Sequence, residues 1–369
     1  ESRRSQVLLV MPCMLKSSGI SSLAASKEGG SFTWITIMAK SRIEIDICLQ
    51  SPGKRAGDAL LRWSDNANPL GVYPVPVACI VGKPGPTALL VAGVHGDEFE
   101  GPVALSQLIE EIIPDQLTGR LIILPAFNAP AVLASQRTSP LDGRNLNRAF
   151  PGDPDGGPTD MLADFLVSVL LPEADLVIDL HAGGKASVFA TSALASRCDN
   201  KQLMQANLDL AAAFGAPFTW ILGGFNDTRS LNAAALNAGV PMIAAELGGG
   251  GGADPIEVAN AVAGVKRCLV HAGIISQNIP QAAPSLYVET RSIADNIYAP
   301  VAGLFDRRFQ AGDQVEKGQL AGYVRSLDRL DNAPIPLHFS ATGHVLAHGN
   351  RGYVVRGDML AMLVCETEI

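Results

Sequence analysis

From about residue 76 onward, short apolar runs alternate with longer segments of helical periodicity, and this alternation leaves the chain few possible folds. The apolar runs have the length and composition of strands and lie at 76–82, 87–94, 120–128, 174–183 and 240–251. The helical patterns lie near 101–113, 160–171, 200–214 and 255–272. Because parallel strands need long crossover connections, the alternation predicts an α/β fold with a mixed, mostly parallel sheet between helices on both faces.

Length and charge narrow the classes of function. A chain of 369 residues is longer than a single core usually supports, so we expect a larger and a smaller domain. Lys and Arg total 28 against 36 Asp and Glu, which gives a net charge of -8 and no surplus of basic residues to bind phosphates. No apolar run approaches the roughly 18 residues that a membrane-spanning helix needs. We therefore expect neither a nucleic acid nor a membrane as partner.

Residues 1–37 differ in character from the rest of the chain. Two arginines, a short apolar stretch and small residues near Ala24 and Ala25 outline a secretory signal, but Lys16 interrupts the apolar stretch. A convincing start, MAKSRIEIDICL, follows at Met38. We expect residues 1–37 to be an N-terminal extension outside the folded domains, with an export signal as the alternative.

The cysteines give no sign of an oxidising compartment. They lie at Cys13, Cys48, Cys79, Cys198, Cys268 and Cys365, without a CxxC pair or a dense framework. Such scattered cysteines are typical of ordinary thiols in a reduced compartment. A cytoplasmic location is therefore expected.

The composition changes after about Pro284, where the helical patterns stop and short strands with glycine turns begin. Two segments of this region each carry a pair of glycines at the same spacing, Gly303 with Gly312 and Gly343 with Gly352. This weak repeat resembles a biotinyl or lipoyl-type barrel sandwich, although neither half has a lysine at a hairpin tip for modification. We expect a β barrel-sandwich domain over residues 285–369, preceded by a main domain over residues 38–284.

Ionisable side chains stand at the carboxyl ends of three apolar strands, in GVHGDE, DLHAGG and AELGGGG, where open α/β sheets bind their ligands. His95 and Glu98 are spaced so that an imidazole nitrogen and a carboxylate oxygen can meet on one cation. Such a pair alone is common by chance, but His181 in the second motif offers a third ligand. Two histidines and a carboxylate are a ligand set of catalytic zinc with one position open. The sequence therefore predicts one zinc ion per subunit.

Two further carboxylates belong to the same strand ends. Asp179 points to the same side of its strand as His181 and either supports that ligand or caps a loop. Glu246 is the one carboxylate in the apolar strand before the third motif, and burial raises the pKa of such a group towards that of a general base. The alternative for Glu246 is a salt-bridged core glutamate. The glycines at 248–252 predict a flexible rim or a close approach of backbone to ligand.

The segment RTSPLDGRNLNRAFPGD, from Arg137 to Asp153, is polar and dense in turn residues, which predicts a loop. Its guanidinium and amide groups suit the binding of a carboxylate and the polarisation of a carbonyl. We assign Asn147 and Arg148 to the substrate. Arg137 is assigned to stabilisation of the oxyanion that forms when a carbonyl is attacked.

Four motifs occur in the order GVHGDEFEGP, DGRNLNRAFPGD, DLHAGG and AAELGGGG. Together they resemble the succinylglutamate desuccinylase and aspartoacylase family, which is related to the zinc carboxypeptidases. The resemblance covers about residues 76 to 369 and implies a zinc-carboxypeptidase-like fold with the β domain attached. It also implies one site, with zinc held by His95, Glu98 and His181, Glu246 as general base, and Asn147 with Arg148 on a substrate carboxylate.

Within that family, two segments are similar in sequence to the N-acetyl-diaminobutyrate deacetylases of ectoine degradation. They are SPLDGRNLNRAFPGD and GGFNDTRSLNAAALNAGVPMIAAELGGGG. Leu236 stands where aspartoacylases typically carry a second arginine shortly before the general base. We expect Arg229 to take over its contact with the substrate. This departure disfavours aspartate-type and succinylglutamate-type substrates.

The residues and the resemblance together predict a zinc-dependent amidohydrolase of amino-acid metabolism, which removes a small acyl group, most simply acetyl, from an N-acyl amino acid. The alternatives on the same scaffold are a succinylglutamate desuccinylase or aspartoacylase proper and a metallocarboxypeptidase. A further alternative is a non-catalytic binding protein with a vestigial metal site. The expected partners are a small-molecule N-acyl amino acid and further copies of the chain, because homo-oligomers are the commonest assemblies of soluble proteins.

Overall fold

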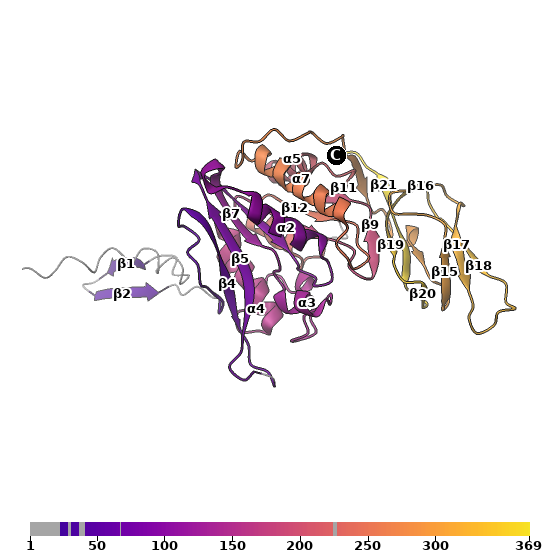
Figure 1. Cartoon of the computed structure of the whole chain (residues 1–369), viewed down its shortest axis with the longest axis horizontal. Coiled ribbons are helices and arrows are strands. Elements are labelled where there is room, and N and C mark those ends of the chain that lie inside the picture. Colours follow the sequence, from indigo (N-terminus) through magenta and orange to yellow (C-terminus); the bar gives the residue numbers. More distant parts are fainter. Residues whose placement is uncertain (1–22, 29–30, 37–40, 67, 224–226) are drawn as a thin grey trace, which may run out of the picture.

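The computed structural model describes residues 23–28, 31–36, 41–66, 68–223 and 227–369. Within these residues, one continuous mixed sheet of 15 strands runs through the molecule (Figure 1). A separate sheet of four strands from the C-terminal part of the chain lies at the right-hand end of the molecule in this view. The predicted α/β class with an additional C-terminal β region is confirmed.

Parallel strands form the centre of the long sheet, in the order β7 (Thr118–Leu124), β6 (Lys83–Ala92), β8 (Leu176–His181) and β12 (Met242–Glu246). Each of them coincides with an apolar run of the sequence. On one side follow the antiparallel strands β5 (Val72–Val81), β4 (Gly53–Arg62) and β3 (Glu44–Ile45). On the other side β10 (Ser192–Ser196) is antiparallel to β12, and β11 (Phe218–Leu222) and β13 (Leu286–Glu289) continue parallel to β10.

Helices cover both faces of this sheet. One face carries α2 (Glu100–Glu111), α5 (Lys201–Phe214) and α7 (Pro255–His271), and the other carries α3 (Ala129–Ala134), α4 (Pro158–Phe165) and α6 (Leu231–Ala238). The two apolar cores lie on opposite faces, and neighbouring residues of each central strand alternate between them. The predicted helical segments are confirmed as α2, α4, α5 and α7, whereas α3 and α6 were not predicted.

The alternation along β8 sets the direction of two candidate site residues. Ile178 and Leu180 belong to the core under α2, α5 and α7, whereas Val177 belongs to the opposite core. Asp179 and His181 therefore share the face of Val177. Nε2 of His181 lies 2.8 Å from Oδ2 of Asp179, which confirms that the two side chains point to the same side.

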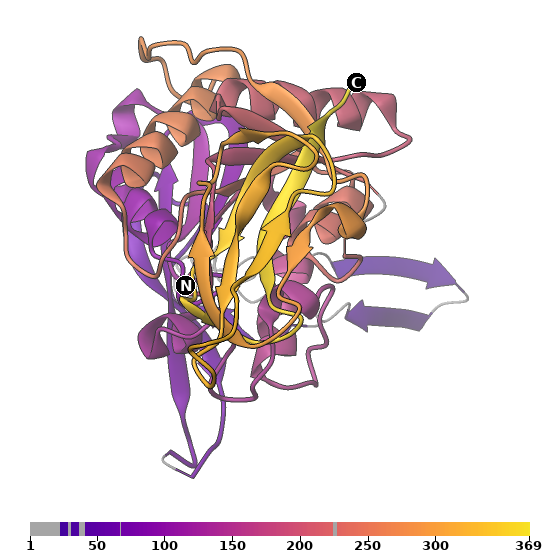
Figure 2. The same cartoon turned by 90° about the vertical axis from the view of Figure 1, so that its right-hand side faces the viewer.

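The C-terminal strands form a sandwich of two layers (Figure 2). One layer extends the long sheet with β14 (Ile297–Tyr298), β16 (Gln314–Val315), β19 (Gly343–Gly349) and β21 (Met359–Glu366). The four-stranded sheet consists of β15 (Gly303–Arg307), β17 (Leu320–Arg325), β18 (Ile335–His338) and β20 (Tyr353–Val354). Phe309, Phe339 and Leu360 are among the side chains that fill the core of the sandwich. The predicted barrel-sandwich architecture is confirmed.

Two strand pairs join the sandwich to the rest of the molecule. β21 pairs with β13, and β9 (Ser187–Phe189), which follows the loop after β8, pairs with β19. The backbone amide of Asn350 also donates to the carbonyl oxygen of Ala186 at 2.8 Å. The sandwich therefore contacts the segment that directly follows His181.

The predicted extension, residues 1–37, lies mostly outside the described residues. Its described part is an antiparallel hairpin of β1 (Leu23–Glu28) and β2 (Ser31–Thr36), which stands apart from the main sheet in Figure 1. In the described part of the chain, no helix combines the length and apolarity that a membrane crossing needs. Among the cysteines, Cys79, Cys198, Cys268 and Cys365 are free thiols, whereas Cys48 takes part in a disulfide, contrary to the thiol expected there.

Candidate metal centre

The candidate ligands lie at the carboxyl ends of neighbouring parallel strands. His95 and Glu98 belong to the loop between β6 and α2, and His181 is the last residue of β8. Glu246, the last residue of β12, is the register partner of His181. The topology thus brings together three segments that are far apart in the sequence, as the strand-end pattern predicted.

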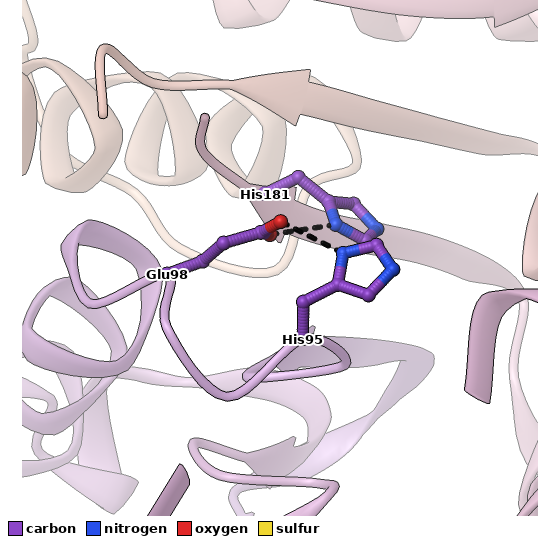
Figure 3. Close-up of side chains that lie close together, drawn as sticks. All are labelled: His95, Glu98 and His181. Atoms are coloured by element: carbon purple, nitrogen blue, oxygen red, sulfur yellow. Dashed lines mark hydrogen bonds and ion pairs between the residues drawn. The ribbon is translucent and has the colours of Figure 1, made fainter. Parts of the chain in front are cut away.

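The three predicted ligands converge on one point. One ligand atom from each of His95, Glu98 and His181 lies within 4.8 Å of the other two. Nδ1 of His95 is 2.7 Å from Oε1 of Glu98, and Nδ1 of His181 is 2.9 Å from Oε2 (Figure 3). The three residues are 3%, 2% and 5% exposed, so all three candidate ligands are buried.

The outer ring nitrogens of both histidines face oxygen acceptors. Nε2 of His95 is 3.1 Å from Oδ1 of Asn145, and Nε2 of His181 is 2.8 Å from Oδ2 of Asp179. A neutral imidazole that donates from Nε2 keeps a lone pair on Nδ1. With both rings in this form, the Nδ1 lone pairs of His95 and His181 point at the negatively charged oxygens of Glu98. Lone pairs and carboxylate repel one another unless a cation lies between them. The donor set therefore fits a divalent cation bound by both Nδ1 atoms and Glu98.

The charges of the site agree with this assignment. Burial lowers the pKa of His95, which keeps its ring neutral. Burial alone would raise the pKa of Glu98, but the charges and hydrogen bonds of His95 and His181 hold that pKa well below its usual range. Burial would lower the pKa of His181, but the carboxylates of Asp179 and Glu98 raise it well above 6.5. Because histidine binds a metal in its neutral form, a cation at this site competes with a proton on His181.

Glu246 lies beside the three ligands, as the register partner of His181. Among the described residues, its Oε2 is buried and accepts no hydrogen bond. Burial raises the pKa of Glu246 to about 8 in the absence of a metal ion. The alternative of a salt-bridged glutamate finds no support, since no ion pair to Glu246 occurs in the described part of the chain. A partly buried carboxylate whose Oε2 is buried and unpartnered is available to accept a proton.

The structure brings Arg137 to the metal centre. Its Nη1 lies 3.2 Å from Oε1 of Glu98, and its side chain is 49% exposed. Arg137 therefore reaches from the solvent side of the site to the buried carboxylate of Glu98.

The other predicted substrate residues form a separate cluster. Asn147 and Arg148 lie in the short 3-10 turn η2 (Leu146–Arg148), and Arg229 lies just before α6. Both arginines contact Asp227, a residue that the sequence patterns did not indicate. Oδ1 of Asn147 accepts from the backbone amide of Leu231 at 3.0 Å, so this oxygen holds the start of α6.

The glycines after Glu246 allow two backbone segments to approach closely. The carbonyl oxygen of Gly248 accepts from the amides of Gly183 and Phe189 at 3.1 and 2.8 Å. Gly249 has a φ of +136°, and a Cβ atom there would lie 2.4 Å from the carbonyl oxygen of Ser187. Glycine is therefore required where the loop after β12 packs against the loop after β8.

Asn145 was missed by the sequence reasoning, although it orients a ligand. Its Oδ1 accepts from the amide of Asn147 at 2.9 Å and faces Nε2 of His95. Asn145→Ala removes the partner that fixes the tautomer and orientation of His95, and we expect zinc affinity to fall by roughly 10–100-fold. Competition with a fluorescent zinc chelator measures this affinity.

Two variants control for a general loss of structure. Asn145→Asp keeps an oxygen at the same position and should retain zinc affinity within about threefold. Asn237→Ala changes an exposed asparagine of α6 and should have no effect. Unchanged zinc affinity in Asn145→Ala would contradict the positioning role of Asn145.

The chain is similar to proteins of known sequence over most of its length. The profile of the succinylglutamate desuccinylase/aspartoacylase catalytic domain matches residues 84–272. The N-alpha-acetyl-L-2,4-diaminobutyric acid deacetylase of Halomonas elongata is 33% identical over 324 residues, which cover 88% of this chain and 95% of that enzyme.

Solved structures extend the similarity to the fold. A succinylglutamate desuccinylase/aspartoacylase from Rhodobacter sphaeroides superposes with a TM-score of 0.84 at 34% identity, over 89% of this chain and 100% of that one. The product-bound ectoine utilization protein EutE (DoeB) from Ruegeria pomeroyi superposes with a TM-score of 0.85 at 36% identity, over 88% and 99% of the two chains. With its metal-binding geometry and these matches, the chain belongs to the succinylglutamate desuccinylase/aspartoacylase family.

Proposed function

We propose that this protein is a zinc-dependent deacylase that removes the acetyl group from Nα-acetyl-2,4-diaminobutyrate, with a place in ectoine degradation. The observation that carries this proposal is the convergence of His95, Glu98 and His181 beside the unpartnered oxygen of Glu246. The similarity to the Halomonas elongata deacetylase and to the Ruegeria pomeroyi ectoine utilization protein supports the choice of substrate.

The residues of the chain divide the reaction between them. A zinc ion held by His95, Glu98 and His181 would supply Lewis-acid activation of the water and of the amide carbonyl. Glu246 removes a proton from the attacking water as the new carbon–oxygen bond forms. It returns that proton to the nitrogen as the carbon–nitrogen bond breaks, which gives acetate and a free amine. Arg137 faces the developing oxyanion from the solvent side of the site.

The substrate carboxylate is assigned to the polar turn next to the metal centre. Asn145 begins this turn and faces Nε2 of His95, and Arg148 ends it. One short turn therefore links the residue that supports a metal ligand to the guanidinium that we assign to the carboxylate. Asn147 lies between them, and the amide nitrogen of its side chain is the group that we assign to the substrate.

The proposal also covers the domain organisation, the location and the assembly of the protein. We place the catalytic domain at residues 38–284 and the β-rich domain at residues 285–369, with residues 1–37 as an extension. The protein is proposed to act in the cytoplasm as a homo-oligomer with one zinc ion per subunit. Gel filtration with light scattering measures the assembly.

A substrate panel tests this function. Zinc-replete protein is expected to hydrolyse Nα-acetyl-2,4-diaminobutyrate with a kcat/KM at least about tenfold above that for N-acetylaspartate or N-succinylglutamate. Liquid chromatography with mass spectrometry detects the free amine. A preference for N-acetylaspartate or N-succinylglutamate would identify one of the family's other activities. Release of C-terminal residues from peptides would indicate a carboxypeptidase, and no turnover of any member would contradict the enzyme assignment.

A further inference from the structure

Asp227 bridges the two arginines that were assigned to the substrate. Nε of Arg148 is 2.9 Å from Oδ2 of Asp227, and Nη2 of Arg229 is 2.9 Å from the same oxygen. Arg229 also donates from Nε to Oδ1 of Asp227 at 3.0 Å. The three side chains therefore form one charged cluster.

Backbone contacts fasten the two segments of this cluster to each other. The amide of Leu231 donates to Oδ1 of Asn147, and the amide of Phe150 donates to the carbonyl oxygen of Arg229 at 3.1 Å. The turn that carries Arg148 is thus attached to the segment that carries Asp227. Because that turn begins at Asn145, the partner of His95, the cluster has a defined position relative to the metal centre.

The two guanidinium groups differ in the donors that remain available. Arg229 directs Nε and Nη2 at both oxygens of Asp227, which occupies one whole edge of its guanidinium. The closest approach of Arg148 to Asp227 is through Nε, and its Nη1 donates to the carbonyl oxygen of Asn147 at 2.6 Å. In the described part of the chain, Nη2 of Arg148 donates no hydrogen bond to a protein acceptor. Arg148 therefore keeps donors for an incoming carboxylate.

The charge of the cluster suits a ligand with one carboxylate. Hydrogen bonds from Arg229 lower the pKa of Asp227 to about 2, so this carboxyl is ionised. One carboxylate between two guanidinium groups leaves a single positive charge. The side chains of Arg148 and Asp227 are 42% and 25% exposed, so a small solute can reach them.

We propose that Asp227 is a positioning residue, which fixes the guanidinium of Arg148 for the substrate carboxylate, and that Arg229 holds Asp227 instead of contacting the substrate. This inference rests on the proposed function, in which Arg148 binds that carboxylate. A partly exposed arginine loses rotational freedom when it binds a ligand. Because Asp227 restricts Arg148 beforehand, less entropy is lost on binding. Loss of Asp227 should therefore weaken substrate binding and leave the rate of the chemical step unchanged.

The test uses Asp227→Asn, which removes the charge and keeps the shape of the side chain. The probes are Nα-acetyl-2,4-diaminobutyrate and N-acetyl-2-aminobutyrate, which differ only in the γ-ammonium group. Calorimetry in a Glu246→Gln background gives the Kd of both probes without hydrolysis. We expect Asp227→Asn to raise both Kd values, and the KM of the first probe in the active enzyme, by about tenfold, with kcat within about twofold.

Two further variants separate positioning from general loss of structure. Arg229→Gln should raise both Kd values similarly, and the double variant with Asp227→Asn should bind no more weakly than the single variants, because both act through Arg148. Thr228→Ala changes an exposed neighbour on the same segment and should leave every value unchanged. Circular dichroism and thermal unfolding establish that each variant is folded. If Asp227→Asn does not fold, Arg229→Gln, at a side chain 62% exposed, carries the test alone.

The opposing results have distinct meanings. A lower Kd in Asp227→Asn means that Asp227 competes with the substrate carboxylate, and a rise confined to the diaminobutyrate probe means that it binds the ammonium group. Unchanged Kd values, or additive effects in the double variant, mean that Asp227 does not act through Arg148. Each of these results overturns the inference. If the wild type binds both probes but hydrolyses neither, the proposed function fails while the Kd comparison still decides the role of Asp227.

Discussion

Glu246→Gln is expected to lower kcat by roughly 10²–10⁴-fold, the usual contribution of a general base. Glutamine has the shape of glutamate but cannot take a proton from water at neutral pH. Among the described residues, Oε2 of Glu246 has no hydrogen-bond partner, and Glu246 lies next to His181 across the β8–β12 strand pair. Because Glu246 is not one of the three converging ligands, bound zinc should remain at the wild-type level. Steady-state kinetics and elemental analysis of the same sample measure both quantities.

A matched variant controls for loss of a negative charge. Glu111→Gln changes a glutamate at the far end of α2 that pairs with Lys266, and its kcat should equal that of the wild type within about twofold. A zinc-loaded Glu246→Gln enzyme with nearly normal kcat would contradict the assignment of Glu246 as base. Loss of zinc along with activity would instead place Glu246 among the metal ligands.

His181→Ala is expected to abolish both stoichiometric zinc binding and turnover. The substitution leaves only His95 and Glu98 at the site and removes one of the two histidines that lower the pKa of Glu98. A ligand that binds only the folded state stabilises it by about 4 kcal/mol when its concentration is a thousand times Kd. Added zinc should therefore raise the Tm of the metal-free wild type and leave that of His181→Ala unchanged. Differential scanning calorimetry of chelator-treated protein measures the shift.

The control for this variant is His271→Ala, at an exposed histidine that ends α7. It should keep the zinc content, the zinc-dependent shift in Tm and the activity of the wild type. Zinc bound at one equivalent by His181→Ala, with an unchanged shift in Tm, would show that the metal lies elsewhere.

The fold could be predicted where burial leaves a strong pattern in the sequence. β8, for example, is buried along its whole length, and apart from Asp179 and His181 its residues are apolar. β4 is mostly exposed or half-buried and contains glycine and charged residues, so no such pattern indicates it. β10 is fully buried, but it consists of small residues that resemble a loop or a helix equally well. Its antiparallel pairing with β12 depends on tertiary contacts, which the local amino-acid pattern does not indicate.

The residues of the site could likewise be predicted only where they interrupt an apolar pattern. His95, His181 and Glu246 are polar residues at the ends of apolar strands. Burying an unpaired polar group there costs free energy, so a polar residue at such a position indicates a functional role. Asn145 and Asp227 gave no such signal, because both lie in loops where polar residues are ordinary. Their roles arise from contacts with His95 and Arg148, which lie 50 and 79 residues away along the chain. Such contacts become visible only once the sheet has brought the loops together.

The central claim is that one zinc ion is held by Nδ1 of His95, Nδ1 of His181 and the carboxylate of Glu98. Diffraction data collected above and below the zinc absorption edge, from crystals of the purified protein, test it most directly. We predict one anomalous peak per chain, about 2.0–2.2 Å from each of the three ligand atoms. A zinc-replete crystal with no peak at this position, or with zinc bound through Nε2 of either histidine, would contradict the account.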